Sequence, residues 1–163
     1  MTDSVVKIIT EAALLINSTL ETLCAFRDEM DRLSSMLPEY EVVMELYGVG
    51  KVLGSQLIAE IGDVRRLDSS KSLVAMAGID PPPNQSGQVD QKSRSISKRG
   101  SSALRKTLFQ IMTIIIQNKP VDEPVYQFLD KKRSEGKPYR VYMIAAAHKF
   151  LRIYYARVME TVT

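Results

Sequence analysis

The chain has 163 residues, of which 45% are hydrophobic and 25% are charged, and its formal net charge at pH 7 is +3. This composition is that of a folded domain and excludes disorder for most of the length. No uninterrupted apolar run approaches the roughly 20 residues of a membrane span, no signal-peptide pattern opens the chain, and a single cysteine, Cys24, excludes an internal disulfide. We therefore expect a cytoplasmic protein without a membrane partner.

The charge is unevenly distributed. Up to Leu46 the sequence holds three basic and nine acidic residues, a net charge of −6. The remaining residues include 19 basic and 10 acidic ones, a net charge of +9. A basic body behind an acidic segment indicates a polyanionic partner such as nucleic acid, and the alternative is a solvated surface that happens to be basic.

Residues 1–38 are predicted to form one long amphipathic, coiled-coil-like helix. Apolar side chains recur at alternating spacings of three and four, with only Thr19 breaking the series, and no glycine or proline interrupts it before Pro38. Such a seam favours a homo-oligomer, and the alternative is a helix packed on its own body. The series comprises Val5, Ile9, Ala12, Ile16, Thr19, Leu23, Phe26, Met30, Leu33 and Leu37.

Residues 39–62 follow a helix-hairpin-helix pattern. A short helix leads into Gly48-Val49-Gly50, and a second helix begins at about Lys51 and ends at Gly62. Glycines allow close approach to a phosphate, and the free N–H groups of the second helix and the charge of Lys51 would bind it without reading sequence. The alternative is a tight turn without a ligand.

A short helix should begin at Ser69 or Ser70 and end at Gly78, followed by a basic loop over residues 80–100. Three prolines and scattered serines make this loop irregular, with weak alternation that is compatible with a β-hairpin around residues 85–97. So long an irregular segment in a compact domain is typical of function or disorder. From Pro81 to Lys106 the single acid is Asp90, and the basic residues are Lys92, Arg94, Lys98, Arg99, Arg105 and Lys106.

Three helices are predicted over residues 101–163. The first begins at Ser101 or Ser102 and is apolar around most of its circumference, as expected of a core helix. The second opens at Asp122-Glu123-Pro124 and closes at Gly136. The last runs from about Pro138 to Val158, and the fold is therefore all or mostly α over the body, residues 39–163. Its predicted apolar stripe is Val141, Ile144, Ala145, His148, Leu151, Tyr155 and Val158.

Ser86, within Asn84-Gln85-Ser86-Gly87, has two interpretations. Serine and glycine are common turn residues. A serine can also attack a phosphodiester if cations and N–H donors neutralise the phosphate. Gly87 permits close approach, and the neighbouring cations Lys98, Arg99 and Arg105 could clamp the phosphate. No general base stands out, because the single histidine, His148, lies on an apolar stripe that is typical of a core residue.

Four segments in this order resemble the C-terminal transposase domain of the IS-one-ten group of insertion-sequence transposases, which includes Piv-like DNA invertases and bridge-RNA-guided recombinases. They are GVGKVLGSQLIAEIGD, LVAMAGIDPPPNQSG, SISKRGSSALRKTLF and GKPYRVYMIAAAHKFLRIYYA. The resemblance extends from about Glu39 to the end of the chain. The R-I-S-K-R-G run of the group has one extra serine here, between Arg94 and Ile96.

The resemblance implies a DNA recombinase module in which Ser86 becomes covalently joined to DNA. The DNA-binding residues that we predict are Gly48, Gly50, Lys51, Gly87, Lys92, Arg94, Lys98, Arg99 and Arg105. It also implies a guide (bridge) RNA as a second partner. In the group, Mg²⁺ is held by a RuvC-like domain, which this sequence lacks. We therefore expect no cofactor here, and a piece that binds DNA but does not recombine it alone. The alternatives are a non-catalytic helix-hairpin-helix module for DNA or structured RNA, and a helical adaptor that works through its N-terminal helix.

Overall fold

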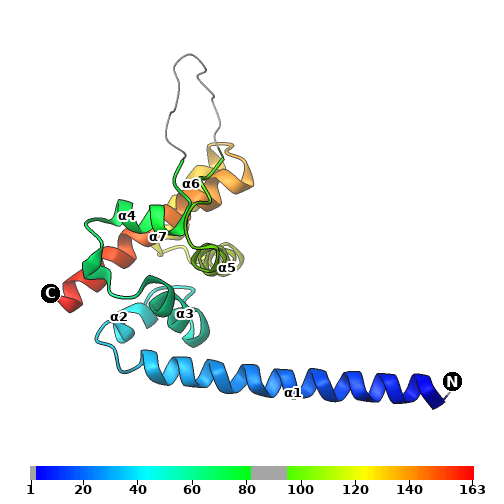
Figure 1. Ribbon diagram of the computed structural model, residues 1–163. Helices are drawn as coiled ribbons and strands as arrows, with labels where there is room; N and C mark the ends of the chain where they lie inside the picture. The colour runs from blue at the N-terminus through cyan, green and yellow to red at the C-terminus, as the bar shows by residue number, and fades with distance from the viewer. Residues whose placement is uncertain (1–2, 82–94) are drawn as a thin grey trace.

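A long helix, α1, projects from a body made of the other helices (Figure 1). The structure, a computed structural model, describes residues 3–81 and 95–163. Within these residues the chain has no strand, which confirms the expected α fold. The elements are α1 (Asp3–Ser34), α2 (Tyr40–Met44), α3 (Lys51–Ile61), the 3-10 helix η1 (Val64–Arg66), α4 (Ser70–Ala77), α5 (Ser102–Asn118), α6 (Pro124–Ser134) and α7 (Tyr139–Val162).

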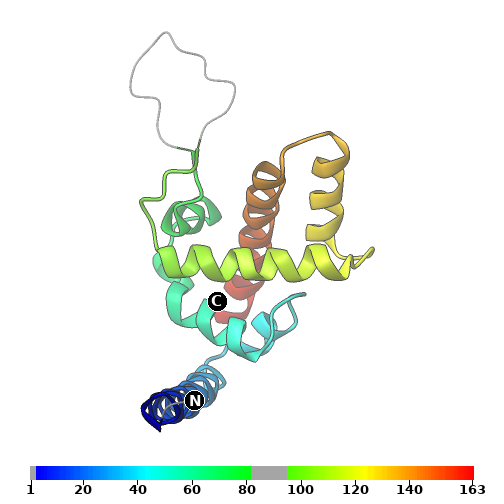
Figure 2. The same ribbon diagram turned by 90° about the vertical axis from the view of Figure 1, so that its right-hand side faces the viewer.

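Helix α5 is the core helix that its apolar circumference predicts. It contacts α3, α4, α6 and α7, and it crosses the middle of the body in Figure 2. Ser101 caps it, because the Ser101 hydroxyl accepts a hydrogen bond from the Leu104 N–H at 3.1 Å. Its inward side chains are buried and hold the surrounding helices together: Leu104, Thr107, Leu108, Ile111, Met112 and Ile115.

Among the residues that the structure describes, helix α1 contacts the body near its C-terminal end. There Asp31 accepts hydrogen bonds from the Tyr40 hydroxyl at 2.7 Å and the Ser55 hydroxyl at 3.3 Å, and the helix packs on α3. The rest of its apolar face is exposed, so packing along its whole length on its own body, the alternative considered from the sequence, is wrong. The large exposed side chains are Val5, Val6, Ile8, Ile9, Leu14, Leu15, Ile16, Leu20, Leu23, Phe26 and Leu33.

By length and composition, α1 also meets the requirements of a membrane-spanning helix near the N-terminus, although these two properties are weak evidence by themselves. Short uninterrupted apolar runs are therefore not sufficient to exclude a span, because the few charges of α1 are spread along an otherwise apolar helix. The expected absence of a membrane partner stays a prediction.

The buried face of α7 is rotated from the stripe predicted for it. Val141 is exposed, and only Leu151 and Val158 of that stripe are fully buried. The helix is apolar on several sides, so periodicity alone did not fix which side faces α4, α5 and α6. The side chains that are buried are Tyr142, Met143, Ala146, Ala147, Phe150, Leu151, Tyr154 and Val158.

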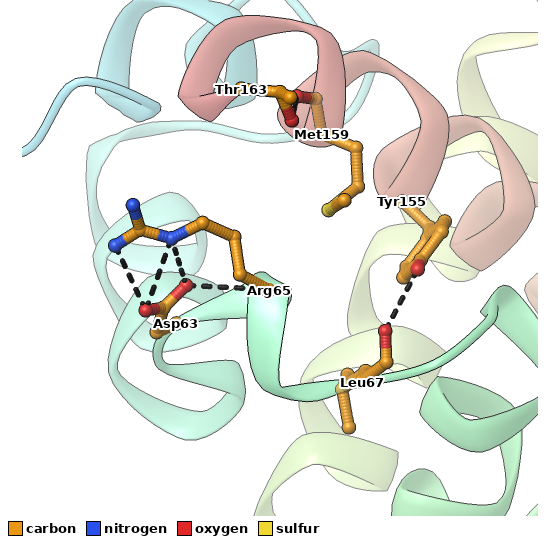
Figure 3. A network of polar contacts seen from close by, with 6 residues as sticks. All are labelled: Asp63, Arg65, Leu67, Tyr155, Met159 and Thr163. Carbon is orange, nitrogen blue, oxygen red and sulfur yellow. Dashed lines mark hydrogen bonds and ion pairs between the residues drawn. The ribbon is translucent and has the colours of Figure 1, made fainter.

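The end of α7 is held against the connection between α3 and α4 (Figure 3). The Tyr155 hydroxyl donates a hydrogen bond to the Leu67 carbonyl at 2.8 Å. In the same corner Asp63 caps η1 and pairs with the Arg65 guanidinium, which lowers the pKa of the Asp63 carboxyl mainly through that hydrogen bond. Asp63 is therefore engaged in holding this connection.

Candidate nucleic-acid interface

The two arms of the basic loop are joined at its base, which we call the loop stem (residues 78–81 and 95–101). The Lys98 N–H donates a hydrogen bond to the Gly78 carbonyl at 3.0 Å, and the Ser97 N–H donates to the Asp80 carbonyl at 2.7 Å. The Ser97 hydroxyl also donates to the Asp80 carboxylate at 2.6 Å. The ends of the loop are thus fixed in space on the body.

The loop stem requires glycine where its arms meet the end of α4. Gly78 ends α4 with φ of +63°, a left-handed conformation that glycine adopts without penalty. A Cβ on Gly78 would lie 2.6 Å from the Gly100 nitrogen, and one on Gly100 would lie 2.6 Å from the Ala75 carbonyl oxygen and nearer still to the Met76 carbonyl oxygen. Backbone therefore packs directly on backbone here.

Arg105 braces the same contact from α5. One guanidinium nitrogen, Nη1, donates a hydrogen bond to the Ala77 carbonyl at 3.0 Å, at the C-terminal end of α4. A cation is favourable at this end of a helix, because the last carbonyls have no partner within the helix. Arg105 thus has a structural role beside the phosphate contact predicted for it.

His148 joins α7 to the loop stem. Its Nε2 lies 3.0 Å from the Ile79 carbonyl oxygen. Since a carbonyl only accepts, Nε2 carries the proton in this hydrogen bond. The half-buried ring is therefore satisfied by a backbone partner, as expected of a core histidine.

Lys98 and Arg99 are the exposed cations of the loop stem. Lys98 has φ of +55°, and for a residue other than glycine this conformation costs roughly 1–2 kcal/mol. Its hydrogen bond to Gly78 helps to maintain it. Both side chains extend from a backbone that is anchored on α4. In sequence they follow the segment that contains Ser86.

Four of the predicted site residues, Ser86, Gly87, Lys92 and Arg94, lie outside the described residues. Most of the possible β-hairpin lies there too, and residues 95–97 at its end are not in a strand. The predicted site residues that the structure brings together are Lys98, Arg99 and Arg105.

The Gly48–Gly50 turn is a separate location, between α2 and α3. Gly48 has φ of +80°, and a Cβ there would lie 3.2 Å from the Ile115 side chain of α5. Gly48 is thus required for packing. Gly50 has no atom within 4 Å of an added Cβ, so the start of α3 is open. Lys51 lies 3.7 Å from Asp31 and is strongly exposed. The helix-hairpin-helix phosphate contact stays a prediction.

The described residues do not fit a magnesium site. Across residues 3–81 and 95–163 there is no group of three histidine, cysteine, aspartate or glutamate side chains that could hold a metal ion. Asp63 is paired with Arg65 and Asp80 with Ser97, so neither carboxylate is arranged as a ligand.

Sequence reasoning missed the residues that hold the loop stem together. They are Gly78 and Gly100, which meet across the stem, and Asp80 and Glu60, which accept the hydroxyls of Ser97 and Ser101. The sequence predicted Gly78 as the end of a helix, and Gly100 was noted only as part of the basic run that includes Lys98 and Arg99. Nothing local indicated that these two segments touch, because the contact joins backbone atoms that are distant in sequence.

Residues 40–127 match the family described as "Transposase IS116/IS110/IS902 family". The chain is also 32% identical over 114 residues to the pilin gene-inverting protein of Moraxella bovis, covering 69% of this chain and 34% of that protein. It is 26% identical over 121 residues to the insertion element IS900 uncharacterized 42 kDa protein of Mycobacterium paratuberculosis, covering 74% of this chain and 29% of that protein. The chain thus spans about a third of the length of these relatives. With more than half of its residues inside the family match, the chain belongs to the IS116/IS110/IS902 family of transposases.

Proposed function

We propose that this chain is the DNA-binding, serine-bearing part of a transposase or site-specific recombinase that acts in the cytoplasm, and that Ser86 is its nucleophile. The observation that carries the proposal is the family match, because it includes both helices of the Gly48–Gly50 turn, the loop and α5 in one continuous range. The name of the Moraxella bovis relative, a gene-inverting protein, is consistent with this kind of reaction.

The loop stem supports the proposal electrostatically. A serine oxygen that attacks a phosphodiester meets negative charge, and the phosphate must be neutralised for the attack to proceed. Lys98 and Arg99 supply two exposed cations from an anchored backbone at one end of the loop. The left-handed backbone at Lys98 is a strained feature of the kind that recurs at functional sites.

In the proposed reaction the Ser86 oxygen forms a bond to a DNA phosphorus atom while one bridging P–O bond breaks. The proton of the serine leaves to a base, and the displaced DNA oxygen takes up a proton. His148 is not the expected base, because its half-buried ring has a structural role as the link between α7 and the loop stem. A group from elsewhere in the complete transposase is expected to accept the proton, and so the chain alone should bind without forming an adduct.

Replacement of Ser86 in the complete transposase tests the proposal. Ser86→Ala should abolish strand exchange and the covalent protein–DNA adduct while DNA affinity stays nearly unchanged, since only the attacking atom is removed. Ser86→Cys is a softer test, because a thiolate can attack but forms a less suitable bond to phosphorus. The matched control is Ser95→Ala, an exposed serine of the same loop, which should recombine normally. Normal recombination by Ser86→Ala would make Ser86 a turn residue.

A second candidate function is DNA or structured RNA binding without chemistry, through the Gly48–Gly50 turn. The open space in front of Gly50 favours it, since a phosphate could reach the first N–H groups of α3. Under this alternative Lys51→Gln should weaken binding and Ser86→Ala should change nothing in any assay. Under the leading proposal, Ser86→Ala removes recombination.

DNA binding by the chain itself can be measured directly. The basic body predicts weak binding to duplex DNA of any sequence, with an affinity that falls steeply with salt. Lys98→Gln or Arg99→Gln should each reduce the slope of log affinity against log salt by about one. A flat salt response by the wild-type chain would contradict phosphate binding by either route. A guide RNA and the oligomeric state remain further proposals for the complete protein.

A further inference from the structure

The turn between α6 and α7 is a second basic surface, which contains none of the predicted site residues and lies beyond the family match. We call residues 131–141 the α6–α7 tip. It carries five basic side chains and one acid, Glu135, and almost all of it is exposed. The basic residues are Lys131, Lys132, Arg133, Lys137 and Arg140.

The backbone of the α6–α7 tip is held in one conformation by its own hydrogen bonds. The Gly136 N–H donates to the Arg133 carbonyl at 3.0 Å, and the Lys137 N–H donates to the Lys132 carbonyl at 3.3 Å. With Gly136 at φ of +73°, this is the Schellman arrangement that closes a helix. Pro138 then starts α7 with a fixed φ. The cations are therefore displayed on a preformed turn.

Helix electrostatics explain only some of these charges. Lys131, Lys132 and Arg133 lie in the last turn of α6, where cations complement the helix dipole. Arg140 lies in the first turn of α7, where the same dipole makes a cation unfavourable. Lys137 lies between the two helices, so it belongs to neither. Local helix stability therefore does not account for Arg140.

The charge of the α6–α7 tip is only partly neutralised. Glu135 pairs with Lys132 at 2.8 Å, and this contact lowers the pKa of Glu135 mainly through the hydrogen bond from Lys132. In the part of the chain that the structure describes, Lys131, Arg133, Lys137 and Arg140 have no acidic oxygen within 4.0 Å. Four positively charged side chains are thus exposed without an ion pair, as expected for a surface that binds a polyanion.

An aromatic ring lies among these cations. Tyr139 is 55% exposed, and its ring stands edge-to-face on the buried Tyr142 ring, with the centroids 5.4 Å apart. The contact orders Tyr139 while leaving much of the ring accessible. A rigid aromatic ring between basic side chains suits contact with a nucleic-acid backbone and its sugars.

The α6–α7 tip lies at the same end of the body as the loop stem. Both views place them at the end opposite α1 (Figures 1 and 2). His148 contacts Ile79 of the loop stem, and Tyr139 precedes it by nine residues on the same helix. The two residues are therefore about 14 Å apart along α7, a length comparable to about four base pairs of duplex DNA. The tip and the loop stem are thus close enough for a single duplex to reach both.

We propose that the α6–α7 tip binds the sugar–phosphate backbone of duplex DNA while the loop stem contacts a second phosphate of the same duplex. This inference rests on the proposed DNA-binding function and adds a second point of contact to it. Two contacts at a fixed separation orient the duplex relative to the loop, which a single contact cannot do.

The test compares two double variants with equal loss of charge. Lys137→Gln with Arg140→Gln removes two cations from the α6–α7 tip, and Lys7→Gln with Arg27→Gln removes two from α1. All four side chains are exposed, so both variants should fold, as circular dichroism will verify. Affinity for a 20-base-pair duplex is measured against salt for these variants and for the wild-type chain.

The tip variant should lose about two units of the salt slope, one for each phosphate contact, and about tenfold or more in affinity at low salt. The α1 variant should resemble the wild type. If the wild type binds and the two double variants have the same affinity and salt slope, the tip proposal is wrong and the proposed function still stands. A wild type that does not bind would overturn the proposed function itself. If the tip variant loses affinity only for duplex RNA of the same length, the assignment of the tip to DNA is wrong.

Discussion

Helices α1 and α5 have similar apolar content but opposite surroundings. α5 is covered by four other helices, and its inward side chains are buried. α1 is nearly twice as long, and apart from Ser34 none of its described residues is buried. The difference teaches that apolar periodicity predicts that a helix has a face to bury, but not what covers that face.

The exposed face of α1 should be covered by another copy of the chain, which is the largest effect we expect. An apolar strip on a helix about 48 Å long is too extensive to remain in water. Deleting residues 1–27 keeps the Asp31 contacts and should convert a dimer or larger oligomer into a monomer. Light scattering at micromolar concentration measures this. An unchanged oligomer would place the contact elsewhere, and a monomeric wild type would show that α1 stays exposed.

A Leu→Ala substitution should lower the free energy of unfolding much more in α5 than in α1. Leu108 of α5 is 1% exposed and Leu15 of α1 is 69% exposed. Leu108→Ala should lower the free energy of unfolding by about 2–5 kcal/mol through lost burial and a cavity. Leu15→Ala should have little effect in dilute solution and a larger one only at concentrations where copies associate. Urea unfolding at two protein concentrations measures both. An equal loss in the two variants under dilution would contradict the exposed position of Leu15.

Glycine substitution should show how tightly the body is packed. Gly100→Ala places a Cβ against the α4 backbone, which cannot move aside as a side chain would, and should cost about 2–3 kcal/mol. Gly50→Ser is the control, because Gly50 has extended backbone and open space in a helix-capping position. Thermal unfolding of the two variants should show a fall for Gly100→Ala and none for Gly50→Ser. Similar melting temperatures would mean that the Gly100 backbone is not packed closely against α4.

The smallest effect concerns Tyr40, one of the three polar partners of Asp31 on α1. The Tyr40 hydroxyl donates to Asp31, and this hydrogen bond to a carboxylate raises the pKa of Tyr40 above its ordinary value of 10. Because the folded-state pKa is the higher one, the stabilisation is complete below pH 10 and is lost as pH rises through the folded value. The difference in melting temperature between wild type and Tyr40→Phe should therefore shrink as pH is raised from 10 upward. A difference that does not depend on pH would show that Asp31 is not the acceptor.

Local sequence determined where most helices begin and end. Ser101 before α5, Pro124 at the start of α6 and Gly136 after it have chemistry that acts within a few residues. Their positions could therefore be predicted without knowledge of the fold. The four motifs in order likewise indicated the family, although Ser86 and Gly87 lie outside the described residues and their roles stay predictions.

Contacts between distant segments were decided only by the tertiary structure. Which side of α7 faces the core depends on where α4 and α5 lie, and Val141 was wrongly placed for that reason. From the sequence, Arg105 was predicted only as a phosphate contact, because nothing local indicated that its guanidinium binds the Ala77 carbonyl at the end of α4. The sequence by itself determined the helices, because helix formation depends on residues close in the chain, and the uneven charge, because that is a property of composition. Only the tertiary structure showed the contact of Gly78 with Gly100 and the exposure of α1. Both depend on how distant segments of the chain pack against one another.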